Sequence, residues 1–154
     1  MARNPGQWLR SSYALFFQLS WLPEWVLRAR DWTLLPDCPA PDVRMVPGGL
    51  GTRTEMNNEA LIGWTGQAAA NAAVVLSVCT GALLLARAGL LDGLATTTHH
   101  GAIDLLRQVA PRTTIREGVQ VVDNENLVTS PGIDTALQVV GKLHGQEQAQ
   151  KTAQ

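Results

Sequence analysis

Cysteine is scarce in this sequence, and so is an excess of charge of either sign. The two cysteines, Cys38 and Cys79, stand in unlike contexts, which argues against a disulfide scaffold and for a reducing compartment. Lysine and arginine number 12 and aspartate and glutamate 13, so that the formal net charge is −1. With no run of like charge, nothing in the composition points to a nucleic acid or an anionic membrane as a partner.

Long apolar runs near the start of the sequence are also missing. The most apolar segment there, residues 13–27, is interrupted by Gln18, Ser20, Pro23 and Glu24. It is too short and too polar to span a bilayer. It also lacks a basic start and a small-residue cleavage site, which argues against a signal peptide. We therefore expect a cytoplasmic protein, and the length of 154 residues suits one domain with a sizeable core.

The first 31 residues are the least regular part of the sequence. They include Trp8, Trp21 and Trp25, and the last two of these could share one helical face. Pro23 falls inside or at the start of such a helix and weakens the prediction. The segment lacks the clean first strand of an α/β domain, so that a packing arm, a dimer contact and poorly ordered sequence are all open interpretations.

The stretch Val74–Ala86 organises the rest of the chain. Its first five residues predict a buried strand and its alanines and leucines predict a helix. The Cys-Thr-Gly corner between them is typical of a nucleophile elbow, which here would aim the Cys79 thiol at the first amides of the helix and favour the thiolate. Gly81 would leave room for a substrate. A buried structural cysteine fits the local pattern equally well, whereas Cys38, in a proline-rich connector, is expected to be an exposed thiol without function.

The remaining sequence alternates between strand-like and helix-like segments. Strands are predicted at 42–46, 95–98, 113–116, 119–123 and 127–130, and helices at 57–70, 82–89, 101–109 and 133–143, with a polar tail that extends the last helix or frays. This alternation is typical of a mostly parallel sheet with helices on both faces, and the apolar run at 74–78 predicts its central strand. The glycine-rich turn Pro47–Gly51 could cradle an anion or simply turn the chain.

Two adjacent histidines, His99 and His100, follow the strand predicted at 95–98. Ligands bind at the carboxyl ends of parallel strands, so this position favours a functional role over that of an ordinary polar residue. Neighbouring histidines make a poor zinc pair without a third ligand at metal spacing, and the sequence offers none. We therefore expect no metal and no cofactor.

Five motifs can be read together: Pro47–Gly49, Ser77–Ala82, Ala88–Gly93, Thr97–His100, and Val128–Asp134 with Ala136 and Leu137. In combination they resemble the DJ-1/PfpI superfamily (ThiJ/PfpI, class I glutamine amidotransferase-like), and the resemblance covers roughly residues 33–149. The Cys-Thr-Gly-Ala version of the elbow is most similar to the isonitrile hydratase branch and to the ligand-sensing domains of certain AraC-type regulators.

The resemblance implies a flavodoxin-like three-layer α/β sandwich with a mostly parallel sheet, usually as a homodimer that binds a small molecule. It makes Cys79 the nucleophile, with Thr80 and His99 as catalytic neighbours and the amides of Gly49 and Thr80 as an oxyanion-type site. The residues that it places in the substrate pocket are Gly48, Gly49, Leu50 and His100.

Two departures from the family pattern concern the site. The family opens with a strand and a helix that carry an acidic residue in contact with the cysteine, but residues 1–31 do not match this unit. We do not transfer the acid's role to Glu24, and we divide the chain into an unmatched segment, 1–31, and a family-like domain, 32–154. The loop at 130–134 is also several residues shorter than is usual in the family. Because the missing acid and the shortened loop both concern the site, we expect slow or absent turnover of a substrate.

Three functions compete, and the first is favoured. An isonitrile hydratase would use Cys79 to attack the isocyanide carbon, and water would release an N-substituted formamide. A ligand-sensing domain would bind a small molecule without turning it over, although the sequence shows no helix-turn-helix segment of its own. A redox-responsive or chaperone-like protein would oxidise Cys79 to a sulfinic acid.

Overall fold

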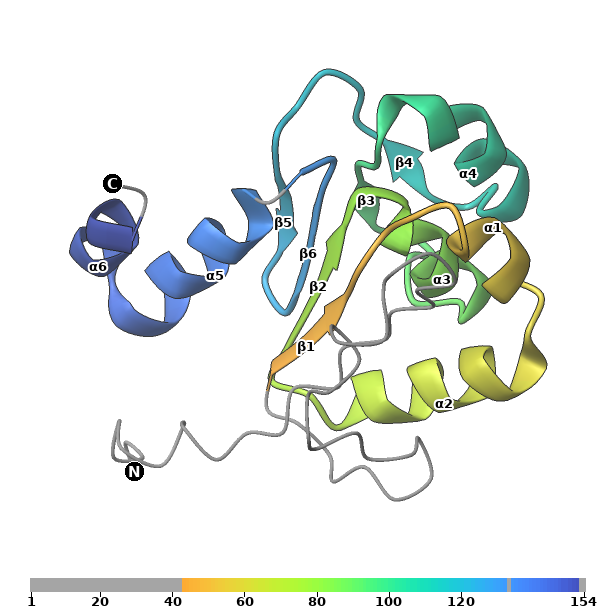
Figure 1. Cartoon of the computed structure of the whole chain (residues 1–154), viewed down its shortest axis with the longest axis horizontal. Helices are drawn as coiled ribbons and strands as arrows, with labels where there is room; N and C mark the ends of the chain where they lie inside the picture. The colour runs from red at the N-terminus through yellow and green to blue at the C-terminus, as the bar shows by residue number, and fades with distance from the viewer. Residues whose placement is uncertain (1–42, 133, 153–154) are drawn as a thin grey trace, which may run out of the picture.

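The computed structural model describes residues 43–132 and 134–152. The predictions for residues 1–31, for Glu24 and for Cys38 therefore lie outside the described residues. Within the described ranges, strands and helices alternate along the chain as the sequence predicts (Figure 1).

A four-stranded sheet forms the centre of the described structure. Its strands stand in the order β1 (Val43–Val46), β2 (Val74–Val78), β6 (Leu127–Ser130) and β5 (Val122–Asn124). The first three strands are parallel, whereas β5 and β6 form an antiparallel hairpin. The mostly parallel sheet and the inner place of β2 are confirmed. The first four residues of β2 are buried, as expected for a strand that is covered on both faces.

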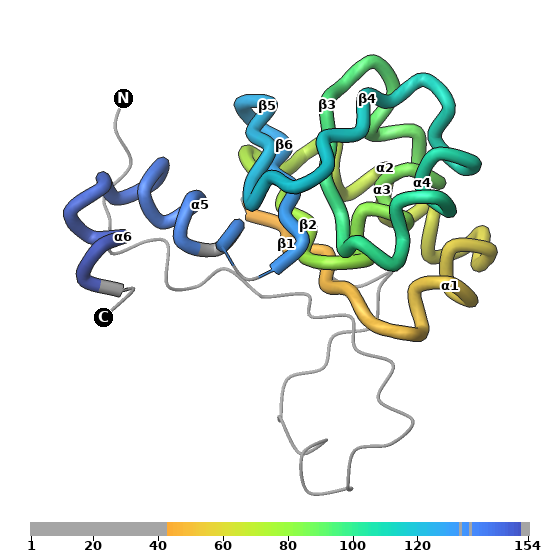
Figure 2. The backbone as a smooth tube through the Cα atoms, turned by 90° about the horizontal axis from the view of Figure 1, so that it is seen from above, coloured from red at the N-terminus to blue at the C-terminus, as the bar shows by residue number. Residues whose placement is uncertain are grey.

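Helices lie on both faces of this sheet, which gives the predicted three layers (Figure 2). One layer contains α1 (Thr52–Glu55), α2 (Glu59–Ala70), α3 (Ala82–Arg87) and α4 (Ile103–Val109), and the other contains α5 (Asp134–His144), against which α6 (Gln146–Thr152) packs. Val75 belongs to the core around α3, and Val74 packs with Val139 on the α5 side. Because successive side chains of a strand point to opposite faces, β2 contributes to both cores.

Two short strands form a second sheet that the sequence does not predict as separate. Strands β3 (Ala95–Thr96) and β4 (Thr114–Ile115) pair in parallel with each other and not with the main sheet. The strand predicted at 95–98 ends early because the Thr97 amide donates to the side chain of Thr129, at 3.0 Å, instead of continuing a ladder. Side chains join the two sheets: Thr96 Oγ1 donates to Thr129 Oγ1 at 3.1 Å and Asn124 Nδ2 to Ala95 O at 2.9 Å.

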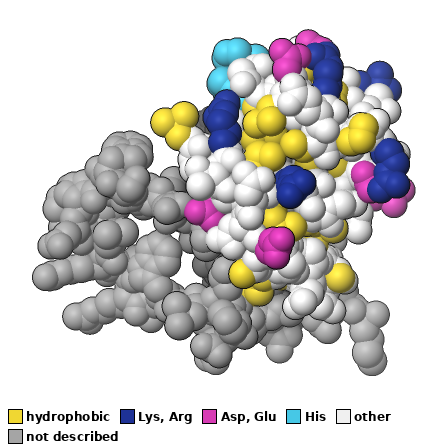
Figure 3. Space-filling view, turned by 90° about the vertical axis from the view of Figure 1, so that its right-hand side faces the viewer, with side chains coloured by type: hydrophobic (Ala, Val, Ile, Leu, Met, Phe, Trp, Pro, Cys, Tyr) yellow, Lys and Arg dark blue, Asp and Glu magenta, His cyan; other side chains and the backbone are white. Residues whose placement is uncertain are grey.

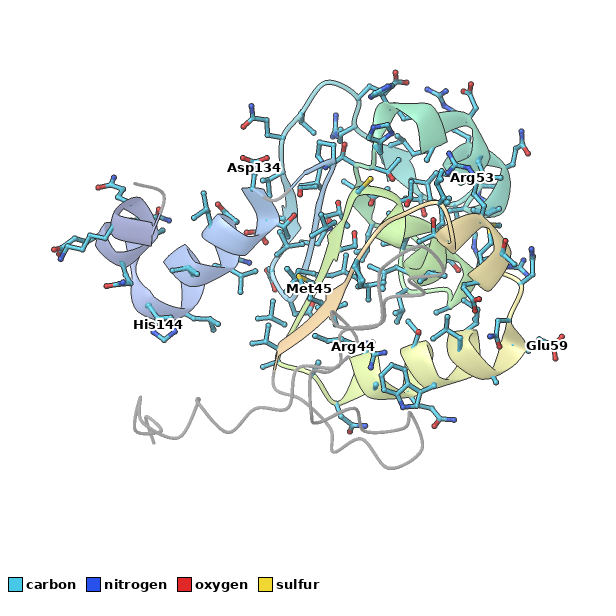
Figure 4. The ribbon with its side chains drawn as sticks, viewed as in Figure 1. Arg44, Met45, Arg53, Glu59, Asp134 and His144 are labelled. Carbon is cyan, nitrogen blue, oxygen red and sulfur yellow. The ribbon has the colours of Figure 1, made fainter. Side chains whose placement is uncertain are left out.

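The sequence predicts Asn57 or Asn58 as the N-cap of α2, and the structure uses Asn58. The Asn58 side chain accepts a hydrogen bond from the Leu61 amide at 3.2 Å, which satisfies one of the unpaired amides of the first turn. The spacing of apolar residues in the sequence predicts an inner face of Ala60, Leu61, Trp64 and Ala68. In the structure Leu61 and Thr65 are buried, whereas Ala60 is exposed. On the same helix, the Trp64 ring lies 3.7 Å from the guanidinium of Arg44 on β1 (Figure 4).

Helix α5 corresponds to the helix predicted at 133–143, and it buries the side chains of Thr135 and Val139. Polar side chains of α5 bind the β5–β6 hairpin, because Lys142 and Gln138 both hydrogen-bond the carboxylate of Asp123 on β5. Partial burial raises the pKa of Asp123, but these hydrogen bonds and the Lys142 charge together outweigh it, so that the pKa lies below its ordinary value. The β5–β6 turn places Glu125 at a φ of +67°.

No helix among the described residues is long and apolar enough to cross a membrane. Basic and acidic side chains are interspersed on the described face shown in Figure 3, as the near-zero net charge leads one to expect. Arg107 forms ion pairs with Asp104 and Glu117, and Arg112 with Asp92.

Candidate functional site

Cys79 lies at a sharp corner between the central strand and a helix. Strand β2 ends at Val78, a 3₁₀ turn covers Cys79–Gly81, and α3 begins at Ala82. Cys79 adopts a φ of +56°, a left-handed conformation that costs an L-residue roughly 1–2 kcal/mol. Its side chain is partly exposed. The structure thus presents the thiol at a strained, accessible turn, which agrees with a nucleophile elbow and not with a buried structural cysteine.

Two glycines allow β1 to approach this corner. A Cβ on Gly48 would stand 2.6 Å from Thr80 N and 2.7 Å from Cys79 Cβ, and a Cβ on Gly81 would stand 2.2 Å from Val46 O. The space beside Gly81 is therefore filled by the backbone of β1. The expectation that Gly81 leaves room for a substrate is wrong, because a neighbouring strand occupies that side.

Three residues form a hydroxyl network behind the corner. Thr80 Oγ1 accepts from the Gly49 amide at 2.9 Å and lies 3.1 Å from Gly49 O. Thr52 Oγ1 lies 2.7 Å from Gly49 O and 2.9 Å from Thr80 Oγ1. Thr52 and Thr80 are both buried. The expected oxyanion role of the Gly49 amide is not met here, because the Thr80 hydroxyl already takes that amide. The Thr80 hydroxyl thus holds the glycine-rich loop against the corner.

The segment after β3 is bound to the corner from another side. Thr98, which is 3 % exposed, donates from Oγ1 to the carbonyl oxygen of Cys79 at 2.8 Å. His99 follows directly and is half-buried, and its Nδ1 accepts from the Gly101 amide at 3.2 Å. The ring of His100, which is exposed, lies 4.1 Å from that of His99 between centroids. The structure thus brings the predicted histidines to the elbow through Thr98.

A third hydrogen bond joins α1 to the segment after β3. Arg53 on α1 donates from Nη2 to Gly101 O at 3.2 Å, and it lies at the end of the molecule where β2 ends (Figure 4). Three segments, 48–53, 79–81 and 98–101, are therefore joined pairwise by hydrogen bonds around Cys79. Such mutual bonding fixes a reactive side chain more firmly than a single loop would.

The carboxyl end of β6 lies beside the elbow in the sheet. Ser130 pairs with Val78, and Thr135 at the start of α5 donates to Ser77 O at 3.3 Å and hydrogen-bonds Ser130 Oγ. Leu50, in the glycine-rich loop, is 86 % exposed and presents an apolar side chain next to Gly49. Within residues 43–132 and 134–152, no group of three His, Cys, Asp or Glu side chains could hold a metal ion.

Sequence reasoning missed Thr52, Thr98, Arg53 and Thr135. The β-branching of Thr98 predicts a strand residue, Thr52 and Arg53 lie outside the motifs, and Thr135 lies between residues of the last motif without a predicted role. The signal that could have found Thr98 is its position directly before the histidines, where its hydroxyl comes to the end of the central strand.

Known proteins share sequence with most of this chain. The DJ-1/PfpI family model matches residues 31–145. Isonitrile hydratase of Pseudomonas putida is 40 % identical over 128 residues, which are 80 % of this chain and 55 % of that protein. The HTH-type transcriptional regulator GbdR of Pseudomonas aeruginosa is 31 % identical over 114 residues, 72 % of this chain and 31 % of the regulator. The chain thus spans about half the length, or less, of these curated relatives.

Solved structures share the fold. A THiJ/PfpI family protein from Pseudomonas syringae superposes with a TM-score of 0.68 at 30 % identity, covering 76 % of this chain and 50 % of that one. DJ-1beta of Drosophila melanogaster gives a TM-score of 0.62 at 24 % identity over 73 % of this chain and 61 % of that one, a likeness of fold alone.

Proposed function

Because this chain belongs to the DJ-1/PfpI family, we propose that it is a cysteine-dependent hydratase that converts an isonitrile to an N-substituted formamide. The observation that carries the proposal is the left-handed Cys79 at the carboxyl end of the central strand. The similarity to isonitrile hydratase supports the choice of reaction. No cofactor is required for this chemistry.

The proposed reaction has two steps. The Cys79 sulfur forms a bond to the terminal carbon of the isonitrile, R–N≡C, and the thiol proton passes to that carbon, which gives a thioimidate, R–N=CH–S, on the enzyme. Water then adds to the same carbon. One water proton goes to the nitrogen and the other returns to sulfur as the carbon–sulfur bond breaks, and the formamide R–NH–CHO leaves.

His99 is the proposed proton carrier. Its Nδ1 accepts from the Gly101 amide, so that in the neutral ring the proton sits on Nε2. An imidazole with a fixed tautomer can deliver a proton in one step and recover it in the next. The Thr80 backbone amide, beside Gly48, is proposed to stabilise negative charge that develops on the substrate.

The proposed substrate pocket lies above the elbow. The exposed Leu50 would contact the apolar group R, and Gly49, which is exposed and has nothing near the place of a Cβ, would allow close approach. Gly48 would line the pocket with its backbone only, because Thr80 N and Cys79 Cβ fill the space on its Cβ side. His100, which is exposed beside His99, would form the polar wall of the pocket together with it. We further propose that the protein acts as a homodimer.

A second candidate is a ligand-sensing domain. The match to GbdR, a regulator, supports it, and so does the engagement of the Gly49 amide by Thr80, which removes one donor that turnover would use. Such a domain would bind a small molecule at the same site and release it unchanged.

Turnover of a simple alkyl isocyanide distinguishes the two candidates. Formamide production is measured for the full chain, for Cys79→Ala and for Glu24→Gln. We expect slow turnover that is lost in Cys79→Ala and kept in Glu24→Gln, since the family acid is not transferred to Glu24. Binding without turnover would favour the sensor. Turnover that survives in Cys79→Ala would overturn the mechanism.

A further inference from the structure

Thr98 stands out among the residues around the elbow because it binds the backbone of the nucleophile itself. Its side chain is almost completely buried, at 3 % exposure, and its hydroxyl donates to Cys79 O at 2.8 Å. The two residues lie on different strands' carboxyl ends, 19 positions apart. This is a long-range contact to the one residue of the corner that holds a left-handed φ.

The peptide unit between Cys79 and Thr80 connects this contact to the site. The described chain has no cis peptide bond, so the Cys79 carbonyl and the Thr80 N–H point in opposite directions from one rigid plane. Thr98 holds the carbonyl side. The nitrogen of the same plane, Thr80 N, lies beside the glycine-rich loop, 2.6 Å from the place of a Gly48 Cβ. A hydroxyl that fixes the carbonyl therefore also fixes the direction of the amide.

Hydrogen bonding at the carbonyl has a second effect on that amide. Donation to a carbonyl oxygen polarises the peptide and makes its N–H a better donor, an effect that grows in surroundings of low dielectric constant. Thr98 and its neighbour Thr97 are both buried, so the donor side of this contact is shielded from water.

We infer that Thr98 is a positioning residue, which aims the Thr80 amide at the reacting centre and holds Cys79 in its left-handed conformation through the Cys79 carbonyl. This inference rests on the proposed function for the role of the amide, but not for the position of the thiol. Thr98 touches no reacting atom in this scheme and acts only through the peptide plane.

The test compares isosteric and conservative variants. Thr98→Val removes the hydroxyl and keeps the shape, and Thr98→Ser keeps the hydroxyl. Thr96→Val is the matched control, because Thr96 is equally buried and its hydroxyl bonds Thr129 Oγ1 at 3.1 Å, away from Cys79. All variants carry Cys38→Ser so that Cys79 is the only thiol. Two readouts are taken: kcat and KM for an alkyl isocyanide, and the rate of Cys79 alkylation by iodoacetamide across the neutral to alkaline range.

We expect Thr98→Val to lower kcat by about 10- to 100-fold with little change in KM, less than the loss of a whole oxyanion donor, and Thr98→Ser to restore it to within about threefold. Alkylation of Cys79 should slow in Thr98→Val and not in Thr96→Val. Equal slowing in both valine variants would reduce Thr98 to a structural residue and overturn the inference.

The two proposals fail separately. If the wild-type chain turns over no isocyanide, the hydratase proposal fails, and the alkylation rates still decide the role of Thr98. If Thr98→Val does not fold, Thr98→Ala and Thr98→Ser are compared instead, and equal alkylation rates in these two would overturn the inference.

Discussion

Gly81 provides a quantitative test of how closely β1 and the elbow are packed. Its φ of −58° and ψ of −26° are helical, so the backbone itself would accept alanine, which is favoured over glycine in a helix by about 1 kcal/mol. The surrounding atoms, however, leave no space for an alanine side chain at this position. A Cβ would lie 2.2 Å from Val46 O and 2.9 Å from Pro47 O, and both atoms belong to the backbone at the end of β1.

The magnitude follows from these two opposing effects. Overpacking costs about 1–3 kcal/mol, and contact with a strand backbone that is paired to β2 belongs at the upper end of that range. Subtracting the helical preference of alanine leaves a destabilisation of about 2 kcal/mol for Gly81→Ala. Because small domains are stable by only about 5–15 kcal/mol, such a loss is readily measured.

Urea unfolding of Gly81→Ala and of Gly63→Ala measures the difference. Gly63 lies inside α2 with nothing near the place of its Cβ, so Gly63→Ala should stabilise the protein by about 0.5–1 kcal/mol. The same substitution is thus expected to have opposite signs at two helical glycines. Wild-type stability for Gly81→Ala would mean that Val46 O does not lie against Gly81, and the description of the elbow would be refuted.

Two further predictions concern the β5–β6 hairpin. Since the pKa of Asp123 lies below its ordinary value, its stabilising contribution is present at neutral pH and is lost as the pH falls through the folded-state pKa. Asp123→Asn should lower the free energy of unfolding by up to about 1 kcal/mol at neutral pH, and the variant should lose less stability than the wild type when the pH is lowered. Urea midpoints at neutral and acidic pH measure both effects, and an unchanged pH profile would contradict the prediction. Glu125 is the first residue of a two-residue turn and has a φ of +67°, where glycine is preferred. Glu125→Gly should raise the melting temperature, and Asn126→Gly, whose φ is not positive, should not.

The sequence predicts the elements that are long or strongly patterned. The apolar run of β2, the corner at Cys79 and the cap at Asn58 all follow from local chemistry, and the structure contains each of them. The four-residue helix α1 is not predicted, because so short a helix has no hydrophobic period to detect. The separate β3–β4 sheet is not predicted either, since only tertiary contacts decide which sheet a two-residue strand joins.

Site details that depend on distant residues could not be predicted in the same way. The sequence predicts that Gly81 and Gly49 face the substrate. In the structure Val46 O fills the space beside Gly81, and the Thr80 hydroxyl binds the Gly49 amide. Each partner lies more than thirty positions away in the chain. A local motif shows that a backbone group is accessible for bonding; it does not show which partner the fold supplies.

The position of β6 inside the sheet has a consequence for the order in which the chain is made. Strand β2 is the most apolar strand of the sheet, and its partner on one side, β6, is synthesised much later. Val75, for example, pairs with Leu127. Until then β2 has an unpaired edge rich in valine, of the kind that pairs with other chains and starts aggregates. The strand that leads to Cys79 is therefore also the segment that most needs shielding while the chain is still on the ribosome. A chain truncated before residue 127 is expected to aggregate.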